Sequence, residues 1–231
     1  MRKSIAVVGL GRFGTCVVTE LSKNKNIDIL AIDIVEENVQ AVADLVENCV
    51  ICDSTKKRDL QHTGISSVDH VIVAIGNNLE ASILTVINIK ALGVKKVTVR
   101  ADDLEHREVF ATLGATDVII PEESSAKSLA NRILSPGIKD YYNLSDAGDF
   151  SIVTIEVNNP SFPNKTLEEL KIRQTYHINL LCINRHDTVF AATPKDVIQY
   201  KDRIVVFGNN KQVKKFNAFV NEKVDELDNE L

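Results

Sequence analysis

The sequence predicts an α/β protein with a doubly wound, Rossmann-like parallel sheet, followed by a small α+β domain. Three observations predict it. Over roughly the first 135 residues, short runs rich in β-branched residues alternate with segments of helical period. Each run is almost continuously apolar, which is typical of parallel strands covered by helices on both faces. A glycine-rich turn at 9–14 follows the first run directly and opens the first helical segment.

Six apolar runs are expected to be the strands of the first domain. In chain order they are SIAVVG, IDILAID, NCVICD, DHVIVAIG, KKVTVR and TDVIIP. Between them the helical period predicts helices at 12–23, 37–47, 78–92, 104–113 and 122–134. Six strands that alternate with helices predict a doubly wound sheet.

The alternation stops near residue 138, where a Pro-Gly pair ends the last of these helices. The following DYYNLSDAGD is interpreted as a connector, and FSIVTIEV, INLLCINR, TVFAA and DRIVVFG as short strands. A short helix is expected at LEELKI and a longer one at 210–220. The chain is therefore expected to have a first domain at 1–138, a second domain at 139–222 and a polar tail at 223–231.

The charge and hydropathy of the sequence argue against nucleic-acid binding, export and membrane-spanning helices. The net charge is −5 and neither half contains a basic block, which argues against nucleic acid as a direct partner. The N-terminal MRKSIAVVGLG meets glycine before a signal-type apolar stretch develops. Apolar runs stay well below the roughly 20 residues that a membrane-spanning helix needs. We expect a cytoplasmic protein.

Two of the four cysteines form a C-x-x-C motif, Cys49 and Cys52. The motif has two interpretations, a redox or metal-binding pair and a pair of core residues. Within a strand, positions three apart point to opposite faces. The sequence also lacks a second such pair and a nearby Cys/His pair. We therefore interpret both as core cysteines.

The glycine-rich turn has the spacing of a dinucleotide-binding fingerprint. Gly9, Gly11 and Gly14 stand between a strand and a helix, and Asp33 ends the next strand 19 residues (33 minus 14) after the third glycine. The first glycine allows the tight turn, the second lets a phosphate approach the backbone, and the third lets the helix pack against the strand. The helix N-terminus offers free N–H donors to phosphates. We expect Asp33 to bind ribose hydroxyls, so an unsubstituted adenosine ribose is predicted; a turn without a ligand is the alternative.

Arg12 lies inside this turn, where a diphosphate bridge requires no charge. Its guanidinium is suited to a terminal or additional phosphate, so ATP or ADP competes with NAD as the expected ligand. A solvated arginine is the alternative. The loops after the third and fourth strands lie at the same sheet edge, where ligands bind in such folds. Asp53 is a candidate for the adenine amino group, and Ser54 and Asn78 are candidates for ligand contacts or for N-caps.

Motifs of known catalytic machinery are missing from the sequence. The five histidines are scattered and none forms an obvious pair with a carboxylate. No G-x-S-x-G, H-E-x-x-H or Walker-type lysine loop occurs. We therefore expect a protein that binds nucleotide and is not an enzyme. The alternative is a small NAD-dependent oxidoreductase.

Several segments resemble one known family. IAVVGLGRFG, LAID, VIVAIGNNLEASILT, ATDVIIPEE and LKIRQTYHINLLCI are similar to the RCK regulatory subunits of bacterial Ktr and Trk potassium uptake systems, with the Ktr gating subunits most similar. The resemblance implies a cytoplasmic ring of eight chains, built from dimers, at the inner face of a separate membrane pore that transports potassium. ATP or ADP, or NAD, in the first domain would control that pore.

The resemblance also implies three groups of site residues. A nucleotide would contact Gly9, Gly11, Arg12, Phe13, Gly14, Asp33, Ile34, Glu36, Asp53, Ser54, Ile75, Gly76, Asn78 and Arg100. Glu122 occupies the place of a carboxylate near a divalent or sodium ion that bridges terminal phosphates. Cyclic di-AMP would bind at a two-fold interface of the second domain, at Leu167, Ile172, Arg173, Ile178, Asn179 and Pro194.

Overall fold

A computed structural model describes residues 2–76, 78–144, 149–160, 162 and 164–221. The chain forms two compact units, Met1–Glu123 and Ser124–Leu231, which are described one at a time. The change from one unit to the other falls within α6 (Pro121–Leu134), whereas the sequence places a domain boundary after that helix, at 138/139. The predicted polar tail, 223–231, lies outside the described residues.

The first unit contains a six-stranded sheet in which every pair of neighbours is parallel, with strand order β3-β2-β1-β4-β5-β6. This confirms the predicted doubly wound sheet. The order reverses at β1, so β2 and β4 lie on either side of it and leave a crevice at their carboxyl ends. The strands are β1 (Lys3–Val8), β2 (Ile27–Asp33), β3 (Asn48–Ile51), β4 (His70–Val73), β5 (Val97–Arg100) and β6 (Asp117–Ile119).

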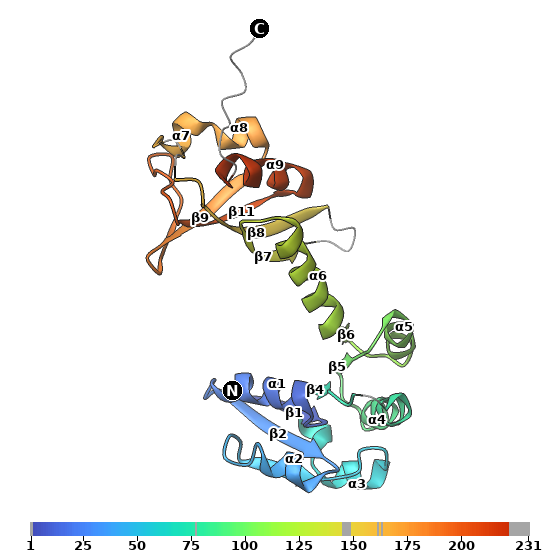
Figure 1. Ribbon diagram of the computed structural model, residues 1–231. Coiled ribbons are helices and arrows are strands. Elements are labelled where there is room, and N and C mark those ends of the chain that lie inside the picture. Colours follow the sequence, from blue (N-terminus) through green and yellow to red (C-terminus); the bar gives the residue numbers. More distant parts are fainter. Residues whose placement is uncertain (1, 77, 145–148, 161, 163, 222–231) are drawn as a thin grey trace. The chain divides into compact units, whose positions relative to one another are not determined.

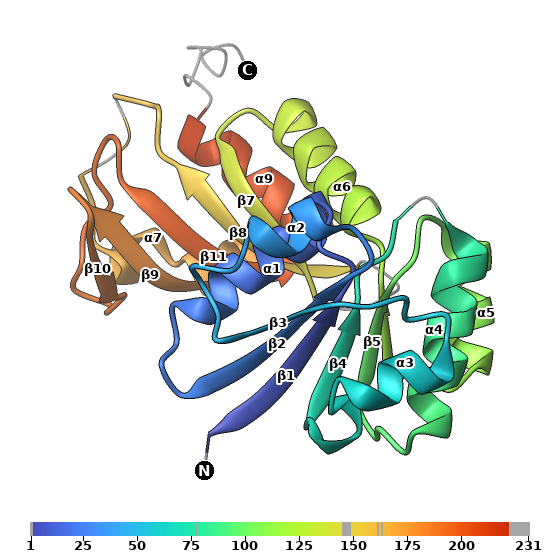
Figure 2. The same ribbon diagram turned by 90° about the horizontal axis from the view of Figure 1, so that it is seen from below.

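Helices cover both faces of this sheet (Figure 2). One face carries α1 (Arg12–Ser22) and α2 (Glu36–Gln40), whose Val18 and Val39 pack in one core cluster with Val7. The other face carries three helices that pack against the neighbouring strand residues in a second cluster. Because successive residues of β1 face opposite clusters, the whole strand must be apolar. The three helices are α3 (Lys57–His62), α4 (Leu79–Ala91) and α5 (Leu104–Thr112).

Two helical segments differ from expectation. The helix expected at 37–47 ends at Gln40, and the chain continues through residue 45 in tight turns whose hydrogen bonds join residues three apart, such as Leu45 N to Val42 O at 2.9 Å. The short helix α3 lies in a stretch without an expected helix, followed by a 3₁₀ turn at Ile65–Ser67. Only one residue of α3, Leu60, is buried, which is too little for a periodic signal.

The second unit contains a five-stranded sheet with order β10-β9-β11-β8-β7, antiparallel throughout. The interpretation of residues 140–149 as a connector is wrong for 140–143, because β7 extends through Asn143 and pairs with β8. Most β7 residues are exposed, so the strand lacks the apolar run that marks the others. The strands are β7 (Ile138–Asn143), β8 (Phe150–Glu156), β9 (Asn179–Arg185), β10 (Thr188–Ala191) and β11 (Arg203–Asn209).

Helices α8 (Ile172–Tyr176) and α9 (Asn210–Asn221) pack together on this sheet (Figure 1). The single helix expected at LEELKI is two helices, because Lys171 has a left-handed conformation with φ 47° and separates α7 (Leu167–Leu170) from α8. A capping box formed by Thr166 and Glu169 fixes the start of α7.

Two carboxylates of the second unit, Asp202 and Glu156, are paired with basic side chains. Asp202 is 1% exposed and accepts two hydrogen bonds from the Arg185 guanidinium, at 2.8 and 2.7 Å. Glu156 lies 3.0 Å from the ammonium of Lys139 and 3.3 Å from that of Lys201. Hydrogen bonds from Lys139 and then Lys201 hold the pKa of Glu156 below its ordinary value.

No helix among the described residues has both the length and the apolar character to cross a bilayer.

Candidate functional site

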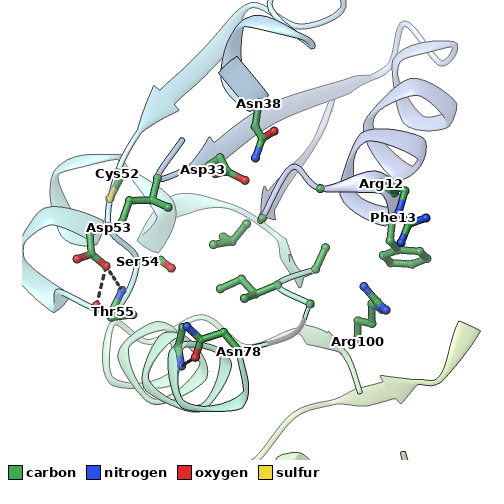
Figure 3. A pocket seen from close by; sticks show the side chains of 18 residues that line it. Arg12, Phe13, Asp33, Asn38, Cys52, Asp53, Ser54, Thr55, Asn78 and Arg100 are labelled. Carbon is green, nitrogen blue, oxygen red and sulfur yellow. Dashed lines mark hydrogen bonds between the residues drawn. The ribbon is translucent and has the colours of Figure 1, made fainter. Parts of the chain in front are cut away.

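A cavity of about 610 Å³ opens at the carboxyl ends of the strands in the first unit (Figure 3). It is lined by the glycine turn after β1, the end of β2, the loops after β3 and β4, and the last residue of β5. These segments are far apart in the sequence and meet because parallel strands end at one edge of a sheet. The strand order reverses at this point, which is where ligands bind in open α/β folds.

Each glycine of the turn has its own reason to lack a side chain. Gly9 has φ +93°, and a Cβ there would lie 2.8 Å from the backbone nitrogen of Ile75. A Cβ at Gly14 would overlap the carbonyl oxygen of Gly9, so this glycine allows close packing of α1 on the turn. Gly11 has nothing within 4 Å of an added Cβ. Gly9 and Gly14 therefore shape the turn, and Gly11 leaves open space beside the backbone.

The N-terminus of α1 faces this open space. Gly11 is the N-cap residue, and α1 has no side-chain cap and no acidic residue in its first turn. The first N–H groups of such a helix are free to bind an anion. Arg12 is exposed at the first helical position, and within the described part of the chain no ion pair to it is formed. The turn thus presents the charge of Arg12, which is unpaired among the described residues, beside the free N–H groups of α1.

Asp33, at the end of β2, joins the glycine turn to the loop that follows β2. Its Oδ2 accepts a hydrogen bond from the backbone N–H of Leu10 at 2.5 Å, and its Oδ1 accepts one from Val35 N–H at 2.8 Å. The side chain is 8% exposed and lines the cavity. A carboxylate has about four acceptor positions, so two stay available for further donors. Asp33 therefore also positions the glycine turn, a role the sequence did not predict.

The loops after β3 and β4 supply three more predicted residues. Asp53 accepts hydrogen bonds from the hydroxyl and backbone N–H of Thr55, and these, with Lys56 nearby, hold the pKa of Asp53 below its usual value. Ser54 makes a 2.7 Å hydrogen bond with Thr85, so its hydroxyl serves packing against α4. Asn78 caps α4 through Ala81 N–H at 2.9 Å. The N-cap interpretation holds for Asn78 and not for Ser54.

Arg100 ends β5 and points its guanidinium toward the cavity (Figure 3). Its Nη2 donates to Glu122 Oε1 at 2.7 Å and lies 3.4 Å from Asp102 Oδ1. A Cβ at Gly76 would lie 2.6 Å from Nη1, so glycine there makes room for the guanidinium. The Nε atom is buried and has no hydrogen-bond partner among the described residues.

Most of the predicted nucleotide residues line this cavity. Gly14 and Glu36 do not: Gly14 packs against Gly9, and Glu36 is exposed and accepts a hydrogen bond from Gln40. The predicted residues found in the lining are Gly9, Gly11, Arg12, Phe13, Asp33, Ile34, Asp53, Ser54, Ile75, Gly76, Asn78 and Arg100. Lining residues that the sequence did not predict are Val8, Asn38, Cys52, Thr55, Ala74 and Ala81, several of them neighbours of predicted ones.

Cys52 and Cys49 lie on opposite faces of the sheet. Cys52 is 8% exposed and belongs to one core cluster, whereas Cys49 packs against the other. Burial raises the pKa of both thiols, and the carboxylates of Asp59 and Asp53 raise that of Cys52 further. All described cysteines are free. The interpretation as a core residue is confirmed for Cys52, whereas Cys49 is half-buried.

Glu122, the residue expected near a cation, lies in the first turn of α6 and pairs with Arg100. In the part of the chain that the structure describes, no group of three or more His, Cys, Asp and Glu side chains is arranged to hold a metal ion. The Glu122 carboxylate instead shares the Arg100 guanidinium with Asp102, so a cation at Glu122 stays a prediction.

A second cavity of about 330 Å³ lies in the second unit. It is formed by α7, α8, the start of β9 and the turn after β10. All six residues expected to contact cyclic di-AMP line it, namely Leu167, Ile172, Arg173, Ile178, Asn179 and Pro194. The other lining residues are Glu168, Gln174, Leu180, Ala192 and Thr193.

The sheet topology, the glycine turn and the acid at the end of β2 together define a Rossmann-type nucleotide-binding domain. Comparison with known proteins identifies the family of the chain. Residues 5–121 match the TrkA-N domain and residues 151–221 match the TrkA-C domain. The chain belongs to the RCK family of Ktr and Trk potassium uptake subunits.

Two relatives come from Bacillus subtilis (strain 168). The chain is 38% identical over 221 residues to its Ktr system potassium uptake protein C, covering 95% of this chain and 98% of that protein. It is 34% identical over 215 residues to Ktr system potassium uptake protein A, covering 93% and 95%.

Among solved structures, the GsuK channel bound to NAD superposes with a TM-score of 0.65 and 14% identity. This match covers 98% of the present chain and 41% of the channel chain, and at this identity it supports the fold alone.

Proposed function

We propose that the chain is the nucleotide-sensing regulatory subunit of a potassium uptake system and controls a separate membrane pore. One observation carries the proposal. A chain that matches two Ktr potassium uptake proteins over nearly their whole length also has a nucleotide-sized cavity at the topological switch point of a Rossmann domain. Neither cavity is lined by a histidine among the described residues, which favours binding over catalysis.

ATP or ADP is the ligand that we propose for the first cavity. The Asp33 carboxylate favours free ribose hydroxyls and repels a 2′-phosphate. Arg12 adds an unneutralised positive charge at the phosphate turn, which suits a terminal phosphate. NAD is the second candidate, because the fold-related GsuK channel has been solved with NAD bound.

The partner that we propose is an integral membrane subunit that transports potassium. The chain would form dimers that assemble into a ring of eight at the inner face of the membrane, in the cytoplasm. Glu122 would help to hold a divalent or sodium ion beside the terminal phosphates. A ring repeats a small free-energy difference at each site, so differences of about 1.5–3 kcal/mol per site suffice for the roughly 5.5 kcal/mol of a near-complete two-state switch.

Side-by-side calorimetry of the full chain with ATP, ADP and NADH tests the first cavity. A clear preference for ATP and ADP, together with ATP-dependent potassium flux after reconstitution with the pore subunit, supports the proposal. The absence of binding to any of these nucleotides refutes it. If NADH binds most tightly and is consumed with a carbonyl substrate, the chain is an oxidoreductase instead.

For the second cavity we propose cyclic di-AMP, bound by a two-fold pair of these cavities. Apolar side chains would stack on the bases, and Arg173 would meet a phosphate. Arg173→Ala in the full chain is expected to weaken cyclic di-AMP binding about tenfold or more, because a charge-assisted hydrogen bond is lost. Lys214→Ala, which removes an exposed charge from α9, is the matched control. Equal affinities in the two variants would contradict the assignment.

A further inference from the structure

The ion pair between Arg100 and Glu122 lies at the margin of the first cavity. The Arg100 side chain is 17% exposed, while that of Glu122 is 64% exposed. The arginine is thus held within the protein by its surroundings, Gly76 included, while the carboxylate that neutralises it stands on the solvent side. Of the two groups, Glu122 is the one that can leave at little cost.

The guanidinium has unused capacity for a second anion. Both carboxylate contacts, from Glu122 and Asp102, involve Nη2. Among the described residues nothing accepts a hydrogen bond from Nε. An arginine has five N–H donors and binds phosphate most strongly through two parallel hydrogen bonds. The contacts through Nη2 alone leave such a parallel pair unmade, and a phosphate in the cavity can form it.

The position of Glu122 in the fold links its pairing with Arg100 to the start of α6. It lies in the first turn of α6, the helix that contains the boundary between the two compact units. No residue of α6 is buried, and the pair with Arg100 is one of the contacts at the start of this helix. A carboxylate in the first turn is also favoured by the helix dipole, and this interaction remains after Glu122 leaves Arg100.

We propose that Arg100 exchanges partners when nucleotide binds: a phosphate group takes the guanidinium from Glu122, and the start of α6 loses its attachment to β5. The proposal rests on the proposed function, because it needs a phosphate-bearing ligand in the first cavity. One anion replaces another at Arg100, so the charge at the guanidinium stays balanced. The exchange makes Glu122 a competitor of the ligand and gives the cavity a direct mechanical link to α6.

Competition has a distinctive signature in binding affinity. In calorimetry of the full chain with EDTA present, Glu122→Gln is expected to tighten ADP binding about two- to fivefold, the range of a partly exposed ion pair. Arg100→Gln is expected to weaken ADP binding about tenfold or more. Adenosine, which has no phosphate, is expected to bind both variants as it binds the wild type. Glu105→Gln, which removes an exposed carboxylate from the first turn of α5, is expected to leave ADP affinity unchanged.

The double variant Arg100→Gln/Glu122→Gln separates competition from a general charge effect. If Glu122 acts through Arg100, the gain from Glu122→Gln disappears when Arg100 is already replaced. Where Arg100→Gln does not fold, Arg100→Lys is used in its place. Lysine keeps the positive charge but cannot donate two parallel hydrogen bonds to a phosphate. Wild-type ADP binding with no gain in Glu122→Gln, or with the same gain in the double variant, overturns the exchange alone. A wild type that binds no nucleotide overturns the proposed function and the exchange together.

Discussion

Replacing Asp33 by alanine removes a carboxylate that the structure uses twice. Its two oxygens accept hydrogen bonds from Leu10 N–H and Val35 N–H. Val35 is 43% exposed, so its N–H regains a water partner in the variant. Leu10 is 2% exposed, so its N–H is left without one. The loss in unfolding free energy is therefore dominated by Leu10 and is expected to be about 2–3 kcal/mol, the value of a hydrogen bond to a charged group.

Urea unfolding followed by circular dichroism measures this loss. Asp28→Ala is the matched control on the same strand: its carboxylate pairs with Arg2 at 3.2 Å, and both side chains are well exposed. That pair is worth about 1 kcal/mol or less. A lower midpoint for Asp33→Ala at unchanged slope, well below that of Asp28→Ala, is expected.

The same variant tests the ribose assignment. Folded Asp33→Ala protein is expected to bind ATP about tenfold or more weakly, since it loses the ribose acceptor and the fixed glycine turn together. Equal stability of Asp33→Ala and Asp28→Ala would refute the positioning role of Asp33. Wild-type ATP affinity in the variant would remove Asp33 from the ligand site.

Three further predictions concern other parts of the chain. Arg12→Ala is expected to bind ADP nearly normally and to lose its preference for ATP in calorimetry; an unchanged preference would place the phosphate sensor elsewhere. Glu156 has a folded pKa below its ordinary 4.5, so its stabilisation is present above about pH 4.5 and lost as pH falls through the folded pKa. Denaturation across pH is expected to show Glu156→Gln less stable than the wild type at neutral pH, with the difference shrinking in acid; a constant difference would contradict the assignment. Arg185→Ala leaves the buried carboxylate of Asp202 unpaired and is expected to cost about 3 kcal/mol of unfolding free energy. A loss below 1 kcal/mol would show that backbone donors suffice for Asp202.

The strands of the first unit and the glycine turn could be predicted from the amino-acid sequence. Both are local patterns: a strand covered on two faces must be apolar throughout, and a phosphate turn needs glycines at fixed spacing. The same reasoning placed Asp33 at the cavity. It failed where the local signal is weak, as in the exposed strand β7 and in the short α3 with its single buried residue.

The contacts between polar side chains and groups far away in the sequence depend on the tertiary structure. Leu10 and Asp33 are 23 residues apart, and Arg100 and Glu122 are 22 apart, so neither pair has a sequence period that reveals it. Each contact exists because parallel strands bring their carboxyl ends to one edge, where loops from different crossovers meet. The nucleotide turn can be recognised in the chain as written, but the hydrogen bonds that attach it to β2, and that attach β5 to α6, exist only in the folded protein.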